Sequence, residues 1–201
     1  MTAYVESNFV LELALQQEEC DACTAIVELA SQGRLVLVVP AFSLAEPHVA
    51  IAGKEKARNQ LRRDLDAQVR DLARSKPHHT VRTDFAAFAG VLADSAQFER
   101  DGVRDSVSDL VQRAEVIALD AVILRSALDV QAEFAMSGQD SIVLASVLAH
   151  LHAHRPAQSC FLNRNTRDFD DPDIRKLLDD QGCKFFGKFG EALRYRNSQI
   201  G

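Results

Sequence analysis

The segment Leu35-Val36-Leu37-Val38-Val39 is a continuous apolar run that ends at Pro40. A short apolar run without alternation is typical of a strand buried on both faces of a parallel sheet. Similar short runs occur at Ala3-Tyr4-Val5, Val116-Ile117-Ala118-Leu119, Ser159-Cys160-Phe161-Leu162 and Cys183-Lys184-Phe185-Phe186. Strands that alternate with helical segments indicate an α/β fold. We expect a three-layer sandwich in which helices flank a central, mainly parallel sheet.

Segments with helical periodicity connect these runs. The apolar spacing predicts helices over about 9–32, where Gly33 supplies the C-terminal stop, over 43–75 and over 81–115. The tripeptide Pro77-His78-His79 breaks the long helix or helix pair at 43–75. Asp120 caps the next helix, a largely apolar and therefore central helix covers about 138–154, and Asp171-Pro172 opens a short one.

The length of 201 residues and the hydrophobic fraction of 47% fit one globular domain over 1–201, with an extended helical region at about 54–115. No apolar run reaches the roughly 18–20 residues that cross a bilayer. The start, Met1-Thr2-Ala3-Tyr4-Val5-Glu6, lacks the basic segment of a signal peptide. The four cysteines do not resemble the disulfide framework of a small secreted domain. Together these features predict a cytoplasmic protein without membrane contact.

Charge is distributed unevenly along the chain. The net charge is −6, but the stretch 54–76 holds eight basic residues against four acidic ones, so it carries +4 and the remainder about −10. A basic stretch of this kind can contact an anionic partner, and Arg58, Arg62 and Arg63 are its candidates for gripping a nucleic-acid backbone. A solvated helix face explains the same charges without any partner.

Acidic and amide residues follow the apolar runs in four places. They lie in Tyr4-Val5-Glu6-Ser7-Asn8, Phe42-Ser43-Leu44-Ala45-Glu46, Gly138-Gln139-Asp140-Ser141 and Leu162-Asn163-Arg164-Asn165-Thr166-Arg167-Asp168-Phe169. Ligands of open parallel sheets bind beyond the carboxyl ends of the strands, so the four acids can face one edge. Converging carboxylates raise one another's pKa, and a divalent ion relieves their repulsion. Oxygen ligands without a His or Cys cluster favour Mg²⁺ or Mn²⁺.

Each acid also has a simpler explanation. Asp140 can be a helix cap, Glu46 a solvated helix residue, and Asp168 a turn residue that caps the helix at Asp171. Glu12 is an alternative ligand in place of Glu6. The metal-site interpretation therefore depends on a fold that brings the four acids together.

In their order along the chain, the four acidic segments resemble the motifs of the PIN domain family, the metal-dependent nuclease fold of toxin ribonucleases in bacterial toxin–antitoxin pairs. The opening through Leu11 resembles the first motif, and Glu46 stands where the family has a glutamate on a helix. The run from Gln139 to Ala145 resembles the third motif, and the run from Leu162 to Phe169 resembles the fourth. The resemblance covers most of the chain except roughly 54–115.

The resemblance implies hydrolysis of phosphodiester bonds, most directly by an endoribonuclease that uses Mg²⁺ or Mn²⁺. It implies an RNA substrate, an antitoxin-like protein partner and a homodimer. It assigns metal binding and catalysis to the four acids, and a supporting hydrogen-bonding role to three polar neighbours. The acids are Glu6, Glu46, Asp140 and Asp168, and the neighbours are Asn8, Ser141 and Asn165.

Two departures from the family pattern leave other functions open. The first motif usually carries Asp where this chain has Glu6, and Asn165 stands where many members carry an acid. These departures favour a catalytically degenerate module that binds protein or RNA. A DNA-directed nuclease of the same kind is a separate alternative, which substrate competition would distinguish.

Two further pairs have spacings that metal or redox sites use. Cys20 and Cys23 fall inside a predicted helix, where cysteines pack as small apolar side chains. His150 and His154 lie one helical turn apart, a geometry that zinc can use, but they lack the intervening glutamate of a zinc-protease helix. We assign neither pair a site from the sequence.

Overall fold

The sheet is parallel throughout and has β1 at its centre. The computed structural model describes residues 1–78 and 80–198, and within them five strands pair in the order β3-β2-β1-β4-β5. The strands are β1 (Thr2–Val5), β2 (Val36–Pro40), β3 (Glu115–Ile117), β4 (Ser159–Leu162) and β5 (Cys183–Phe186). Each matches a predicted run to within two residues. Because all pairings are parallel, the carboxyl ends of the strands meet at one edge.

Helices cover both faces of the sheet, which confirms the predicted three-layer α/β sandwich. Tyr4 of β1 points into one core, which it shares with the helices α5 (Ala121–Phe134), α6 (Gly138–His154) and α8 (Pro172–Asp180). Its neighbours Ala3 and Val5 point into a second core. That core is shared with α1 (Ser7–Leu15), α2 (Cys20–Ser31) and α9 (Phe189–Ser198). Side chains alternate between the faces of a strand, so a strand covered on both faces must be apolar throughout.

The prediction of one helix over 9–32 is wrong, because α1 and α2 are separate helices. Gln16 ends α1 in the left-handed conformation with φ of 49°, and its N–H bonds back to the last turn. The polar run 16–19 contains neither glycine nor proline, so the sequence carries no strong helix-ending signal there. The short helix α7 (Thr166–Phe169) and the C-terminal helix α9 are not predicted from the sequence.

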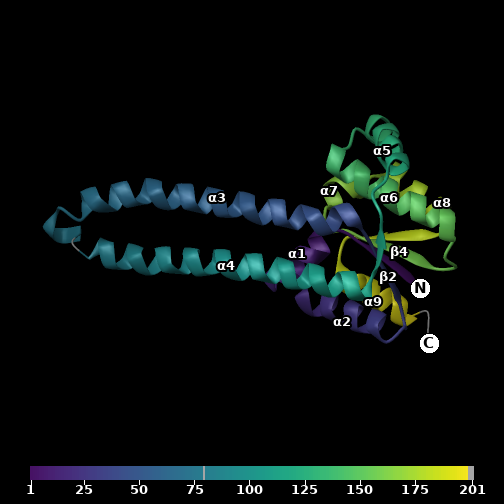
Figure 1. Cartoon of the computed structure of the whole chain (residues 1–201), viewed down its shortest axis with the longest axis horizontal. Helices are drawn as coiled ribbons and strands as arrows, with labels where there is room; N and C mark the ends of the chain where they lie inside the picture. The colour runs from purple at the N-terminus through teal and green to yellow at the C-terminus, as the bar shows by residue number, and fades with distance from the viewer. Residues whose placement is uncertain (79, 199–201) are drawn as a thin grey trace.

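The helices α3 (Ala41–Leu72) and α4 (Val81–Arg113) form a long hairpin that projects from the sandwich (Figure 1). Ion pairs from Glu55 to Arg100 at 2.6 Å and from Arg58 to Glu99 at 2.8 Å join its two helices. The short 3₁₀ turn η1 (Lys76–His78) interrupts the chain where the sequence predicts a break; His79, part of that prediction, lies outside the described residues. The apolar stripe of α3 packs only partly, and Leu61 stays 51% exposed.

Two sequence expectations concern thiols and membranes. All four cysteines are free in the described structure, and Cys23, Cys160 and Cys183 are buried among apolar side chains. Among the described helices, none has the length and apolarity that crossing a membrane requires.

The hairpin is anchored to the sandwich where α4 crosses α1. A Cβ atom added to Gly102 would lie 2.2 Å from the carbonyl oxygen of Ala14. Ala14 is buried there with Ile51 of α3 and Val103 of α4. Only glycine permits this approach, because the obstacle is backbone and cannot rotate away.

We predict that Gly102→Ala lowers the free energy of unfolding by about 1–3 kcal/mol, the usual cost of forcing extra volume into a packed contact. Urea denaturation measures it. Gly90→Ala is the matched control on the same helix, since a Cβ there meets nothing within 4 Å. That control should stabilise the protein by up to about 1 kcal/mol through helix propensity. Equal stabilisation by both substitutions would contradict the close contact.

Candidate active site

Glu6 lies directly after β1 and is almost fully withdrawn from water. Its side chain is 5% exposed, and it serves as the N-cap of α1. Oε2 accepts a hydrogen bond from the backbone N–H of Asn8 at 3.0 Å. Oε1 is buried and has no hydrogen-bond partner among the described residues. A buried carboxylate oxygen in this state is costly unless a proton or a cation satisfies it.

The electrostatic surroundings hold Glu6 in its protonated form. Burial raises the pKa of its carboxyl from 4.5 to about 8, against a lowering by hydrogen bonds from Asn8. The negative charges of Glu46 and Asp140 raise the pKa further. The structure thus brings three of the four predicted acids close enough to interact.

Glu46 reaches the same place from the second turn of α3, which begins directly after β2. Its carboxylate is partly buried and accepts a hydrogen bond from the hydroxyl of Ser7. Ser7 is buried in the first turn of α1, so it holds Glu46 beside the end of β1. The sequence analysis names Glu46 but overlooks Ser7, which directly follows Glu6.

Asp140 lies in the first turn of α6, where the helix dipole favours a negative charge. The N-cap of this helix is Ser137, whose hydroxyl accepts from the Asp140 N–H at 3.1 Å and donates to Asp140 Oδ2 at 2.6 Å. Asp140 is therefore not the cap, and its carboxylate is held from one side. On the other side, Asn165 Nδ2 lies 3.4 Å from Oδ1.

The three carboxylates line one open pocket of about 430 Å³ at the carboxyl edge of the sheet. Segments that follow β1, β2 and β4 contribute to it, as expected for a parallel sheet. The complete lining consists of Glu6, Ser7, Asn8, Leu11, Glu46, Pro47, Ala50, Gln139, Asp140, Arg164 and Asn165.

Two predicted site residues do not line this pocket. Asp168 is exposed on the short helix α7 (Thr166–Phe169) and accepts a hydrogen bond from Asn165 Nδ2 at 2.7 Å. Asn165 thus connects Asp168 to Asp140. Ser141 is buried, and its hydroxyl donates to the carbonyl oxygen of Gly138 at 3.0 Å, within its own helix.

Arg164 brings a positive charge to the pocket wall, and sequence reasoning did not select it. Its guanidinium pairs with the buried carboxylate of Glu12 and with Glu18, the latter at 3.3 Å. Glu12 also accepts from the Glu19 N–H at 2.9 Å. Glu12 is not among the lining residues, so it partners Arg164 and does not stand in for Glu6 as a ligand.

The potential ligand atoms that line the pocket suit a hard divalent cation. Its lining offers carboxylate, amide and hydroxyl oxygens and neither His nor Cys, which is the ligand chemistry of Mg²⁺ and Mn²⁺. The unpartnered Oε1 of Glu6 is an acceptor that such an ion would satisfy. The carboxylates are not tightly gathered, however. Among the described residues, the group of three whose ligand atoms lie within 4.8 Å of one another is Glu115, His150 and His154.

The three candidate arginines lie along α3, away from this pocket. Arg62 follows Glu46 by sixteen positions, or about 24 Å along a helix that rises 1.5 Å per residue. Arg58 is paired with Glu99, whereas Arg62 and Arg63 line a cleft of about 640 Å³ between α3 and α4. Their contact with nucleic acid stays a prediction.

Comparison with known proteins finds similar solved structures but no matching sequence. Neither a protein-family model nor a curated protein sequence matches this chain. A similar solved structure is a chain from the crystal structure of VapBC2 from Rickettsia felis bound to a DNA fragment from their promoter. The two chains are 11% identical, the match covers 87% of this chain and 96% of the other, and the TM-score is 0.48. A likeness at this level does not extend to function.

We predict that Glu6 makes the metal-free protein less stable as the pH rises. Its pKa is about 8 when folded and near the ordinary 4.5 when unfolded, so between these values the folded chain retains a proton that the unfolded chain has lost. Its contribution to stability is intact below pH 4.5 and falls through that window by up to about 1.4 kcal/mol per pH unit.

The measurement is urea denaturation in EDTA between pH 5 and pH 8. Glu6→Gln keeps the shape of the side chain but cannot ionise, so its stability should decline less steeply than that of the unmodified protein. The difference between the two curves isolates Glu6 from the other titrating groups. Parallel curves would show that Glu6 titrates normally in the fold.

Proposed function

We propose that this protein is a metal-dependent phosphodiesterase, and specifically an endoribonuclease of the PIN type. The observation that carries the proposal is the meeting of Glu6, Glu46 and Asp140 in one open pocket at the carboxyl edge of a parallel sheet. The resemblance of the four acidic segments to PIN motifs supports the same function. The pocket is open to solvent and lined by acids, which suits a cation that must still reach a phosphate.

Glu6, Glu46 and Asp140 would hold Mg²⁺ or Mn²⁺ directly or through water. Such an ion, when bound, polarises a phosphate and lowers the pKa of a coordinated water. The residues of the chain supply the positioning. Ser7 fixes Glu46, and Ser137 fixes Asp140, so two ligands are set before any ion arrives, which lowers the cost of ordering them.

Asp168 takes part indirectly in this proposal. Its carboxylate is exposed and bonded to Asn165, which also faces Asp140. We assign Asp168 the role of positioning Asn165 at the rim, where it can orient water or hold a second ion. The resemblance assigns Asp168 direct metal binding, whereas this proposal assigns it the positioning of Asn165.

Arg164 would contact the phosphate from the pocket wall, because it is the cationic side chain among the lining residues. Its ion pairs with Glu12 and Glu18 restrict its motion. Guanidinium groups match phosphate oxygens through paired hydrogen bonds. An RNA chain that reaches from here along α3 would meet the cleft of Arg62 and Arg63.

The degenerate alternative rests on a specific observation. Asp168 lies outside the pocket, and Asn165 replaces the acid found in many PIN domains, so the site has three acids where the family pattern has four. Three acids can still retain a structural ion without hydrolysis, in a module that binds protein or RNA. An antitoxin-like partner and a homodimer both stay predictions of the resemblance.

We predict that Asp140→Asn lowers metal-dependent cleavage of labelled single-stranded RNA by about 100-fold or more, since it removes charge from the reacting centre. Cleavage is followed with Mn²⁺, Mg²⁺ or EDTA, and single-stranded DNA is run in parallel to decide the substrate. Asp129→Asn is the matched control: the chemical change is identical, and Asp129 is exposed on α5, outside the pocket.

Cleavage that survives in Asp140→Asn or in EDTA would contradict this mechanism and indicate a contaminating nuclease. Absence of cleavage in every sample would favour the degenerate module. Preference for DNA would retain the chemistry but change the substrate.

We predict that Arg62→Ala and Arg63→Ala weaken RNA binding measured in EDTA. For a single strand, each phosphate contact contributes about 0.7 to the slope of log affinity against log salt. Each substitution should therefore reduce the slope by about that amount. Arg125→Ala, on the exposed face of α5, should leave it unchanged. An unaltered slope in the hairpin variants would identify their arginines as a solvated helix face.

A further inference from the structure

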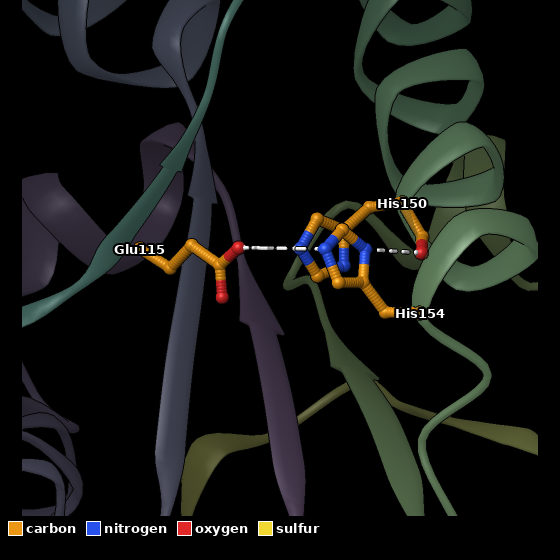
Figure 2. A group of neighbouring side chains, drawn as sticks. All are labelled: Glu115, His150 and His154. Atoms are coloured by element: carbon orange, nitrogen blue, oxygen red, sulfur yellow. Dashed lines mark hydrogen bonds and ion pairs between the residues drawn. The ribbon is translucent and has the colours of Figure 1, made fainter.

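A second polar cluster lies near the C-terminal end of α6, at the opposite end from Asp140. It is formed between this helix and the edge strand β3. Figure 2 shows Glu115 of β3 facing His150 and His154, which come from the last turns of α6. His150 Nε2 lies 3.0 Å from Glu115 Oε1, and His154 Nε2 lies 3.9 Å from the same oxygen. The cluster is absent from the lining of the acidic pocket. Asp140 and His150 are ten positions apart, or about 15 Å along the helix.

The strand register explains why Glu115 points toward α6. Glu115 pairs with Val38 of β2, and Val38 pairs with Tyr4 of β1. Residues paired across neighbouring strands point to the same face, and Tyr4 and Val38 both lie in the core beneath α6. The hydroxyl of Tyr4 lies 2.8 Å from His150 Nδ1. His150 is therefore held between β1 and β3.

The proton positions on His154 are fixed by a neighbouring carbonyl. His154 Nδ1 lies 3.1 Å from the backbone oxygen of His150, and a carbonyl oxygen only accepts, so Nδ1 must carry the proton. The neutral ring then has its lone pair on Nε2, the nitrogen that faces Glu115. Metal-bound histidines are typically oriented in this way, by a hydrogen bond from the other nitrogen.

His150 can present the same nitrogen because its partner is a hydroxyl. Tyr4 can donate to Nδ1 or accept from it. When Nδ1 carries the proton, it donates a hydrogen bond to the Tyr4 hydroxyl, and Nε2 of His150 becomes a ligand directed at Glu115. The hydroxyl thus tolerates both tautomers, whereas an obligate donor would tolerate only one.

The spacing of the three ligand atoms suits a small cation. With bonds of about 2.0–2.2 Å at tetrahedral angles, ligand atoms lie about 3.2–3.6 Å apart. The observed separations of 3.0 and 3.9 Å lie on either side of this range. The imidazole rings are stacked with centroids 3.9 Å apart, so the two rings must tilt toward a common point for both to bind one ion. His154 is 54% exposed and has room to tilt.

We propose that Glu115, His150 and His154 form a binding site for a late first-row divalent cation, of which Zn²⁺ is the representative. Two imidazoles and one carboxylate leave a fourth position for water, a ligand set that zinc accepts. The bound ion joins the short edge strand β3 to the end of α6. The proposal does not depend on the nuclease activity proposed for the acidic pocket.

The test is Zn²⁺ titration of the full-length chain by calorimetry, with excess Mg²⁺ present to compete at the acidic pocket. The variants are His154→Ala and Glu115→Gln. His152→Ala is the matched control, because His152 is exposed on the same helix and belongs to no such group within the described part of the chain. Co²⁺ serves as a spectroscopic probe, since tetrahedral nitrogen-containing sites give intense visible bands and octahedral oxygen sites give weak ones. Circular dichroism in EDTA verifies that each variant is folded.

We expect one equivalent of Zn²⁺ and intense Co²⁺ bands in the unmodified protein and in His152→Ala. Both test variants should bind about tenfold more weakly or worse and lose the bands. Unchanged affinity in His154→Ala and Glu115→Gln would place the ion elsewhere and overturn the proposal. Failure of the unmodified protein to bind Zn²⁺ would overturn it too, and would leave the cluster as a hydrogen-bonded link between β3 and α6.

Discussion

The burial of a carboxylate at the end of the central strand is the constraint on which the arrangement of the acidic pocket depends. Glu6 is fixed there because it caps α1, and one of its oxygens has no partner in the described chain. Transfer of an ionised group from water is costly unless the charge is neutralised. The nearby acids, Glu46 and Asp140, add to that cost. The pocket must therefore hold a proton or a cation, and the same loss of solvent that raises the pKa strengthens the attraction for a cation.

Arg164 does not resolve this excess of negative charge. It reaches the pocket wall, but its guanidinium is paired with Glu12 and Glu18. Glu12 is itself 1% exposed, and breaking a buried pair leaves an uncompensated charge. Arg164 is thereby held at the pocket wall. An arginine free to swing inward would neutralise the acids and compete with a metal ion, so the Glu12 pair preserves the negative potential of the pocket.

Local patterns were sufficient to predict the strands, the layers and the carboxyl edge, because continuous apolar runs and short connections admit few topologies. The same patterns locate Glu6 directly after a strand, Glu46 in the second turn of a helix and Asp140 in the first turn of another. Local patterns do not predict features that depend on contacts between distant parts of the chain or that lack a turn signal. The break between α1 and α2 at Gln16 lacks glycine and proline. The placement of Asp168 follows from the turn before α7. Glu115 meets His150 only through the register of β3 with β2. No spacing along the chain reveals such a pairing over 35 positions.

The two polar clusters at the ends of α6 differ in the chemistry of their ligand atoms. The helix's N-terminal turn favours negative charge and its C-terminal turn favours positive charge. Asp140 lies in the first turn and His154 in the last, with His150 one turn before His154. Carboxylate oxygens suit Mg²⁺ and Mn²⁺, whereas imidazole suits Zn²⁺. Under the two proposals, the ligand types would direct different ions to the two ends of the helix, even though zinc binds most sites more tightly than magnesium does. Because both clusters are joined to β1, one through Glu6 and the other through Tyr4, an ion at either place would stabilise the same central strand.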